Sequence, residues 1–155
     1  GTRIAFDSNL RLSLWPMDRA RACISEAVRL CDLFLPSEGE VKPLMGADDP
    51  LAVLDWAQQL GARQVVLKRG AGGAVVRCGA DQFEVGGHAA RLVDATGAGD
   101  CFAGNLLTRL AQGDAWPEAV RYANAAAALS VQGFGAVAPL PRPPQVRELL
   151  SQVPA

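Results

Sequence analysis

The hydrophobic positions of this chain follow two patterns. Some apolar residues form short continuous runs bounded by Gly, Pro or Asp, which is typical of buried strands, and others recur every three or four positions, which is typical of amphipathic helices. The strands predicted in this way are 3–7, 32–35, 64–68, 74–78, 82–85 and 90–93. The helices predicted in this way are 18–31, 37–44, 50–60, 97–113, 117–131 and 144–153.

The order of these elements predicts the fold class. Strand, helix, strand, helix and strand follow one another at a spacing that favours a parallel sheet with right-handed crossovers. The later strands form a strand-rich insert, after which the chain becomes helical from Gly97 onward. We therefore expect an α/β fold without an internal repeat of about 20–50 residues.

Individual residues mark the ends and faces of the predicted helices. Asp49 can cap a helix that has Pro50 at its first position, and Gly61 ends that helix. Further along, the alanine run 125–128 permits close approach by a backbone or a ligand, although alanine also simply favours helix.

Length and composition narrow the function classes. The 155 residues are 50% hydrophobic and 20% charged, and at this length about 68–70% of the unfolded chain's surface is buried on folding, which is enough for a core. The 15 Lys and Arg against 16 Asp and Glu give a formal net charge of −1, so no basic field for nucleic acid or acidic membranes exists. No apolar run approaches the ~20 residues of a membrane span, and no signal peptide opens the chain. We expect one cytoplasmic domain with no nucleic-acid or membrane partner.

Cysteine and histidine usage excludes several kinds of site. No CxxC pair occurs, and His88 is the only histidine, so neither a Cys/His zinc set nor a Ser-His-Asp or Cys-His catalytic centre has its residues. Cys23 and Cys31 lie in the apolar stripe of helix 18–31, where cysteine behaves as a small core hydrophobe. The pattern indicates a reducing compartment without disulfides.

The segment 93–100, VDATGAGD, is the most informative string in the chain, and it runs straight into an amphipathic helix. Gly97 and Gly99 free the backbone for a tight turn whose N–H groups point outward. With the positive end of the helix behind them, these groups form a site suited to phosphate oxygens. Asp100 beside that site suits a general base that takes a proton from an attacking hydroxyl.

The same string also fits an ordinary helix start. In that interpretation Thr96 or Asp94 caps the helix, the glycines make the turn and Asp100 complements the helix dipole. The second glycine-rich turn, 70–73, decides nothing by itself, because a glycine turn between strands is most often only a hairpin. No Walker A sequence is present. The residues alone leave both interpretations open.

The string DATGAGDCFAGNLL at 94–107 resembles the C-terminal signature of the ribokinase-like (PfkB) family of sugar kinases. This resemblance implies a ribokinase-like parallel-sheet sandwich with helices on both faces. It also implies that Gly97, Ala98 and Gly99 form the anion hole and that Asp100 is the catalytic base, in contact with the acceptor.

The string FDSNLRLSLW at 6–15 resembles the FDxNxRxxLW segment of 2-keto-3-deoxygluconate kinases within that family, with Asp7, Asn9 and Arg11 matching. The resemblance implies that Asn9 and Arg11 bind the acceptor. A guanidinium suits a sugar acid because it pairs bidentately with a carboxylate. Without the resemblance, Arg11 is a solvated loop charge.

Three further segments resemble parts of the family's ATP site. In 35–40, Glu40 matches an Asn-x-x-Glu motif near magnesium and phosphate, although Ser37 replaces the asparagine. Segment 68–73 resembles a KxGxxG turn along the nucleotide, and segment 122–126 resembles the helix that flanks the adenine. The resemblance thus implies an indirect Mg²⁺ role for Glu40. The implied ATP contacts are Ser37, Lys68, Gly70, Gly73, Gly97, Ala98, Gly99 and Asn124.

Members of the family are considerably longer than this chain. Their N-terminal part supplies most sugar contacts and a β-strand lid, and its early Gly-Gly signature does not occur here. We therefore expect residues 1–155 to be the C-terminal nucleotide-binding part of a kinase domain, lacking the N-terminal part and lid, with the chain entered just ahead of the strand that carries Asp7.

The expected function is ATP- and Mg²⁺-dependent phosphorylation of a small sugar or sugar acid, with 2-keto-3-deoxygluconate as the preferred acceptor. Two alternatives stay open: a kinase for fructose, ribose or a nucleoside, and an inactive nucleotide-binding fragment. We also expect a homo-oligomer in the full-length protein. A half-domain with an exposed sheet edge is expected to associate.

Overall fold

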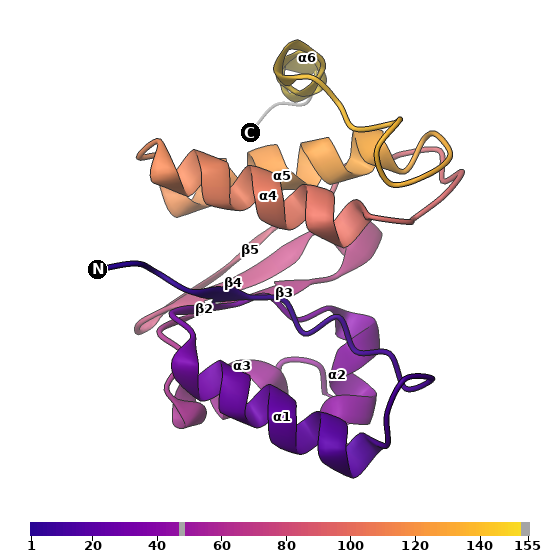
Figure 1. Ribbon diagram of the computed structural model, residues 1–155. Coiled ribbons are helices and arrows are strands. Elements are labelled where there is room, and N and C mark those ends of the chain that lie inside the picture. The colour runs from indigo at the N-terminus through magenta and orange to yellow at the C-terminus, as the bar shows by residue number, and fades with distance from the viewer. Residues whose placement is uncertain (47–48, 153–155) are drawn as a thin grey trace. The chain divides into compact units, whose positions relative to one another are not determined.

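The structure is a computed structural model that describes residues 1–46 and 49–152 of the chain (Figure 1). The chain divides into two compact units. The first unit comprises Gly1–Gly70 and Val75–Glu84, and the second comprises Ala71–Ala74 and Val85–Ala155. Each unit is described by itself.

A five-stranded sheet runs through the first unit in the order β1-β2-β3-β4-β5. β1 pairs in parallel with β2, and β2 with β3. The short connections from β3 to β4 and from β4 to β5 can join only antiparallel neighbours, because a parallel pair needs a long crossover. The strands are β1 (Ala5–Phe6), β2 (Leu33–Phe34), β3 (Gln64–Lys68), β4 (Ala74–Cys78) and β5 (Asp81–Val85).

Three helices of the first unit lie on the same side of this sheet in Figure 1. They are α1 (Met17–Leu30), α2 (Glu38–Met45) and α3 (Ala52–Leu60). Their apolar faces form one core with strand residues such as Phe34 and Val65. Val66, which alternates with Val65 along β3, is also fully buried, so both faces of this strand are covered. That double burial explains the continuous apolar run of β3.

The apolar stripe of α1 is narrower than the sequence predicts. Ile24 and Val28 are almost completely buried, whereas Cys23 is exposed and Leu30 is 66% exposed. The prediction that Cys23 is a core residue is therefore wrong, because the helix meets the sheet along the face of Ile24 and Val28 only. Cys31 is buried as predicted, and burial raises the pKa of its thiol to about 11.

The second unit is built from helices. α4 (Ala98–Ala111) and α5 (Trp116–Ser130) lie side by side, and α6 (Pro143–Gln152) packs on α5. Ala125 and Ala126 are fully buried in the cluster that these helices share with Val146. Two of the four alanines of the run thus pack into the core between these helices.

The predicted end of α3 agrees with the structure, whereas the predicted start at Pro50 is wrong, because α3 begins at Ala52 with Leu51 at its N-cap position. The carboxylate of Asp49 accepts a hydrogen bond from the amide of Leu51 at 2.9 Å, and the regular helix starts one residue later. Gly61 ends α3 with a φ of 115°, in the left-handed region that favours glycine.

The predicted strand 90–93 is wrong. This segment is irregular, and the amides of Val93 and Asp94 both donate to the carbonyl of Val131, just after α5, at 2.8 and 3.2 Å. Its backbone is therefore paired with a helix end instead of a neighbouring strand. At the other end of the unit, the predicted end of the last helix at 153 lies outside the described residues. None of the described helices is long and apolar enough to cross a membrane.

Candidate functional site

The N-terminus of α4 is built around Gly97. This residue has a φ of 76°, which L side chains rarely adopt, and it precedes the first helical residue, Ala98. A Cβ atom at Gly97 would lie 2.9 Å from the Cβ of Ala136. Both the backbone conformation and the available space therefore require glycine at this position.

The first turn of α4 carries backbone amides and a carboxylate that have no hydrogen-bond partner among the described residues. No side chain caps the helix, and the amides of Gly99 and Asp100 donate to no acceptor among the described residues. The side chain of Asp100 is exposed, and within the described part of the chain it has no hydrogen bond or ion pair. Free amides at the positive end of a helix bind an anion, and a free carboxylate beside them can accept a proton.

Asp94 stabilises the turn that leads into α4. Its carboxylate accepts hydrogen bonds from the amide and hydroxyl of Thr96, at 2.9 and 2.7 Å, and from the amide of Gly135 at 2.9 Å. These bonds, the Thr96 hydroxyl first, lower the pKa of Asp94. Asp94 and Thr96 thus bond to each other and to the turn, so neither is the helix cap of the alternative interpretation. That leaves the helix amides available.

Gly73, in the glycine turn, and Asn124 both contact the backbone at residues 85–86 in the second unit. A Cβ atom at Gly73 would lie 2.1 Å from the carbonyl oxygen of Val85, so only glycine permits this approach. The buried Asn124 donates its amide hydrogens to the carbonyls of Val85 and Gly86, at 3.2 and 3.1 Å. Asn124 therefore holds the segment that faces the turn. Gly70, at the start of the turn, has a φ of 56° and open space around it.

Lys68, at the end of β3 in the first unit, is bound to a carboxylate. The residue is only 8% exposed, and its ammonium donates to Asp7, which directly follows β1. Its backbone pairs with Ser37 in an isolated parallel bridge. The side-chain hydroxyl of Ser37 has no hydrogen-bond partner among the described residues. The structure thus joins Asp7, Ser37 and Lys68 at the carboxyl ends of the parallel strands.

Glu40, in the first turn of α2, forms hydrogen bonds with the segment that follows Asp7. Its Oε2 accepts a hydrogen bond from the Ser8 hydroxyl at 2.6 Å, and its Oε1 accepts one from the amide of Leu10 at 3.1 Å. The Arg11 guanidinium lies 3.8 Å from the same carboxylate, and it donates to the carbonyl of Leu10 at 3.1 Å. Asn9, between the two bonded residues, is exposed with a φ of 42°.

Two polar partners in these sites are missed by sequence reasoning. Ser8 lies inside the FDSN string, beside the matched Asn9, and this position is the signal that could have indicated it. Gly135 has no such signal, because its amide meets a carboxylate 41 positions away.

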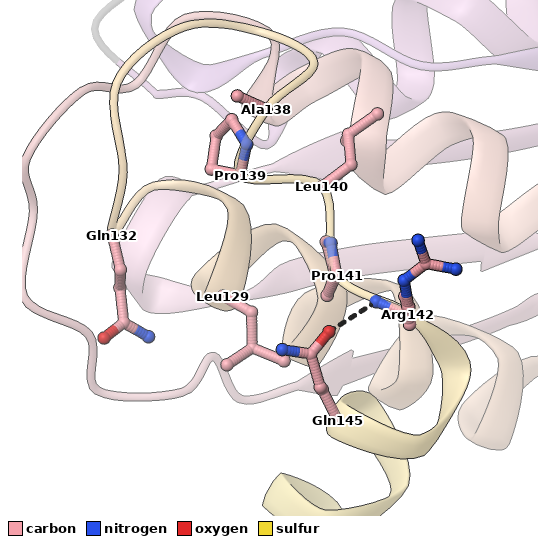
Figure 2. A pocket seen from close by; sticks show the side chains of 8 residues that line it. All are labelled: Leu129, Gln132, Ala138, Pro139, Leu140, Pro141, Arg142 and Gln145. Atoms are coloured by element: carbon pink, nitrogen blue, oxygen red, sulfur yellow. Dashed lines mark hydrogen bonds between the residues drawn. The ribbon is translucent and has the colours of Figure 1, made fainter.

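A pocket of about 460 Å³ lies where the end of α5 approaches the start of α6 (Figure 2). Inside it, the side-chain oxygen of Gln145 accepts a hydrogen bond from the amide of Arg142 at 2.7 Å and so caps α6. None of the site residues predicted from the sequence lines it. The lining residues are Leu129, Gln132, Ala138, Pro139, Leu140, Pro141, Arg142 and Gln145.

Known proteins are similar to this chain in sequence and in fold. A family model described as "pfkB family carbohydrate kinase" matches residues 1–143. A 2-dehydro-3-deoxygluconokinase of Bacillus subtilis is 36% identical, over 97% of this chain and 47% of its own length. An aminoimidazole riboside kinase of Salmonella typhimurium is 32% identical, over 97% of this chain and 49% of its own length. The chain therefore spans about half the length of the curated relatives it matches.

Among solved structures, a fructokinase of Vibrio cholerae with bound fructose, ADP and calcium ion has a TM-score of 0.87. It is 34% identical, and the match covers 96% of this chain and 50% of that one. This likeness confirms the ribokinase-like α/β fold class expected from the sequence.

Proposed function

The chain belongs to the pfkB family of carbohydrate kinases, and from this premise we propose that it carries the anion hole and the general base of an ATP-dependent sugar kinase. The observation that supports the proposal best is the start of α4. There the exposed, unpaired carboxylate of Asp100 adjoins two amides that have no acceptor among the described residues.

In the proposed mechanism, each group at the start of α4 has its own role. The N–H groups of the Gly97, Ala98 and Gly99 turn are proposed to donate to the phosphoryl oxygens and to stabilise charge that develops during transfer. Of these, the Gly99 amide is unpaired in the structure, whereas the Ala98 amide donates to the carbonyl of Ala95 at 3.1 Å and has to exchange that bond for the phosphate. The carboxylate of Asp100 accepts the proton of the acceptor hydroxyl as that oxygen attacks phosphorus. Gly97 keeps the turn open, because any side chain there would meet Ala136.

ATP and Mg²⁺ are the cofactors of the proposed reaction, and the residues present fit them. The uncapped amides suit a phosphate, whereas no group of three or more His, Cys, Asp or Glu among the described residues could hold a metal ion alone. Mg²⁺ is usually bound by substrate phosphates, water and one or two carboxylates, so a protein cage is not needed. ATP supplies the phosphoryl group, and Mg²⁺ neutralises its charge. The predicted contacts of Ser37, Lys68, Gly70, Gly73 and Asn124 with ATP are part of this proposal.

The acceptor we propose is a sugar acid of the 2-keto-3-deoxygluconate type. Asn9 and Arg11 are both exposed, and the Arg11 side chain, 59% exposed, can offer its guanidinium to a carboxylate. The Bacillus subtilis relative named for this substrate supports the assignment, while the fructokinase and riboside kinase relatives keep neutral acceptors as competitors. Phosphorylation rates on a panel of sugars with and without a carboxylate decide between them, and a preference for neutral sugars contradicts the assignment.

The central test replaces the base. Asp100→Asn is expected to lower turnover by about 10²–10⁴-fold, because proton transfer is lost, while ATP binding measured by calorimetry stays near the unsubstituted value. Glu118→Gln is the matched control, since Glu118 is also an exposed acid in the first turn of a helix. Full activity of the Asp100 variant contradicts the proposal.

A second candidate function is nucleotide binding without transfer. The chain spans about half of its relatives' length, so the part of those proteins that it does not match could carry acceptor contacts. Calorimetry with ATP and Mg²⁺ on this chain, beside a phosphotransfer assay, separates the two. Binding without transfer supports the second candidate.

A further inference from the structure

Buried and exposed residues alternate in the segment between β1 and α1. Ser8 and Leu10 are 9% and 7% exposed, whereas Asn9 between them is exposed and has a φ of 42°. A positive φ is uncommon for any residue other than glycine, although asparagine tolerates it better than most. Asn9 is the one non-glycine residue with positive φ among the described residues. Its conformation needs a cause.

That cause is the carboxylate of Glu40, whose two oxygens bond to the two neighbours of Asn9. The Ser8 hydroxyl donates to Oε2 at 2.6 Å, and the Leu10 amide donates to Oε1 at 3.1 Å. One rigid, planar group therefore fixes the chain on both sides of the strained residue. We name this pair of hydrogen bonds the Glu40 clamp.

Both ends of the clamp are anchored in the first unit. Glu40 lies in the first turn of α2, and its own amide donates to the carbonyl of Ser37 at 2.9 Å. On the other side, Asp7 is held by the nearly buried ammonium of Lys68 at the end of β3. Asn9 and Arg11 thus project from a segment whose backbone is held by side chains of two different elements.

The clamp is a use of the Glu40 carboxylate separate from the indirect metal role that the sequence predicts. Its side chain is only 12% exposed, and each oxygen already accepts one hydrogen bond, from the Ser8 hydroxyl or the Leu10 amide. Each oxygen keeps a further lone pair, so the two roles are separated by experiment.

We propose that Glu40 is a positioning residue for the acceptor: it holds Asn9 in the left-handed conformation and so directs Asn9 and Arg11 toward the acceptor. This role rests on the proposed function, which assigns acceptor binding to these two residues. Glu40 acts through Asn9 and through Arg11, whose guanidinium lies 3.8 Å from its carboxylate, and it does not touch the reacting atoms.

Two substitutions at Glu40 separate the clamp from a metal role. Glu40→Gln keeps an oxygen for the Leu10 amide, and its amide nitrogen can donate to the Ser8 hydroxyl, which can turn to accept. The glutamine therefore preserves the clamp and removes the charge. Glu40→Ala removes both hydrogen bonds, and Ser8→Ala removes one of them. Glu38→Ala is the matched control, because Glu38 lies in the same first turn but is exposed.

The first measurement needs no activity and uses the 155-residue chain. Amide hydrogen exchange at Leu10 is expected to be about ten-fold faster in Glu40→Ala, because a hydrogen bond from an amide to a carboxylate is lost. The three-bond coupling between the amide and Hα protons of Asn9 should shift from its left-handed value in the same variant. Glu40→Gln and Glu38→Ala should keep both signals. An unchanged Leu10 amide in Glu40→Ala overturns the clamp.

The second measurement is steady-state kinetics of phosphoryl transfer. Glu40→Ala should raise KM for the acceptor by about ten-fold or more while KM for ATP and the Mg²⁺ requirement change little, and Glu40→Gln should restore the acceptor KM. A Glu40→Gln enzyme with a strongly raised Mg²⁺ requirement overturns the positioning role in favour of the metal role. If the unsubstituted protein transfers no phosphoryl group, the proposed function fails, whereas the clamp is still decided by the exchange measurement.

Discussion

Asp94 shows how a single carboxylate can organise the turn that leads into a helix. It accepts three hydrogen bonds, two from Thr96 and one from Gly135, and these lower its pKa. A lowered pKa means that the ionised group stabilises the folded state. That contribution is fully present above the unfolded-state pKa of about 4 and is lost as the pH falls through the lower folded-state value.

Asp94→Asn is therefore expected to lower the unfolding temperature at pH 7, and the difference from the unsubstituted chain should shrink as the pH falls below about 4. Thermal unfolding followed by circular dichroism from pH 7 to pH 2.5 measures this. Asp18→Asn is the control, since Asp18 is exposed and has no hydrogen bond among the described residues. A difference that stays constant across the pH range speaks against the assigned role of the Asp94 carboxylate.

At the scale of elements, α4 requires glycine at its start but has space for a side chain at the glycine in its middle. Gly97 has both a positive φ and a neighbour 2.9 Å from where a Cβ would lie, whereas a Cβ at Gly104, within the same helix, would meet nothing within 4 Å. The helix thus provides two glycines in opposite environments.

Gly97→Ala is expected to destabilise the chain by about 1–3 kcal/mol and to weaken nucleotide binding, because strain and overpacking both act at the proposed anion site. Gly104→Ala, the control, should stabilise the chain by up to about 1 kcal/mol through helix propensity. Urea unfolding and calorimetry with ATP measure the two effects. Equal stability of both variants is inconsistent with the required left-handed turn.

At the scale of the whole molecule, the exposed strand edge and apolar side chains favour self-association of the chain. β1 is an edge strand of the five-stranded sheet, and the apolar side chains of Ile4, Leu12 and Leu14 are 51%, 51% and 80% exposed. Unpaired strand edges and exposed apolar side chains both favour contact with another chain. The homo-oligomer expected from the sequence stays a prediction.

Sedimentation velocity of the 155-residue chain is expected to show species larger than a monomer, with the proportion rising with concentration. Leu14→Asp should shift the distribution toward monomer, because a charge then lies in the apolar contact. Lys42→Ala serves as a comparison on another part of the first unit. A well-folded chain that stays monomeric at all concentrations contradicts the prediction.

Local sequence was sufficient for much of the fold and for one part of the candidate site. The strand and helix order followed from apolar periodicity, and Gly97 was indicated as a turn residue by its own neighbours. The prediction failed for strand 90–93, because a short apolar run does not say what its backbone will pair with. Here the partner is the carbonyl of Val131.

The sequence by itself determined most of the helices and strands and the position of the glycine turn before α4, because both depend on residues within one or two helical turns of each other. The tertiary structure alone decided which polar side chains meet. Ser8 reaches Glu40 across 32 positions, Asp7 reaches Lys68 across 61, and Asn124 reaches Val85 across 39. Such pairs form only when parallel strand ends and packed helices bring distant positions together. That is the physical reason why the sequence did not indicate that Glu40 bonds to Ser8 and Leu10, while its indirect Mg²⁺ role stays a prediction.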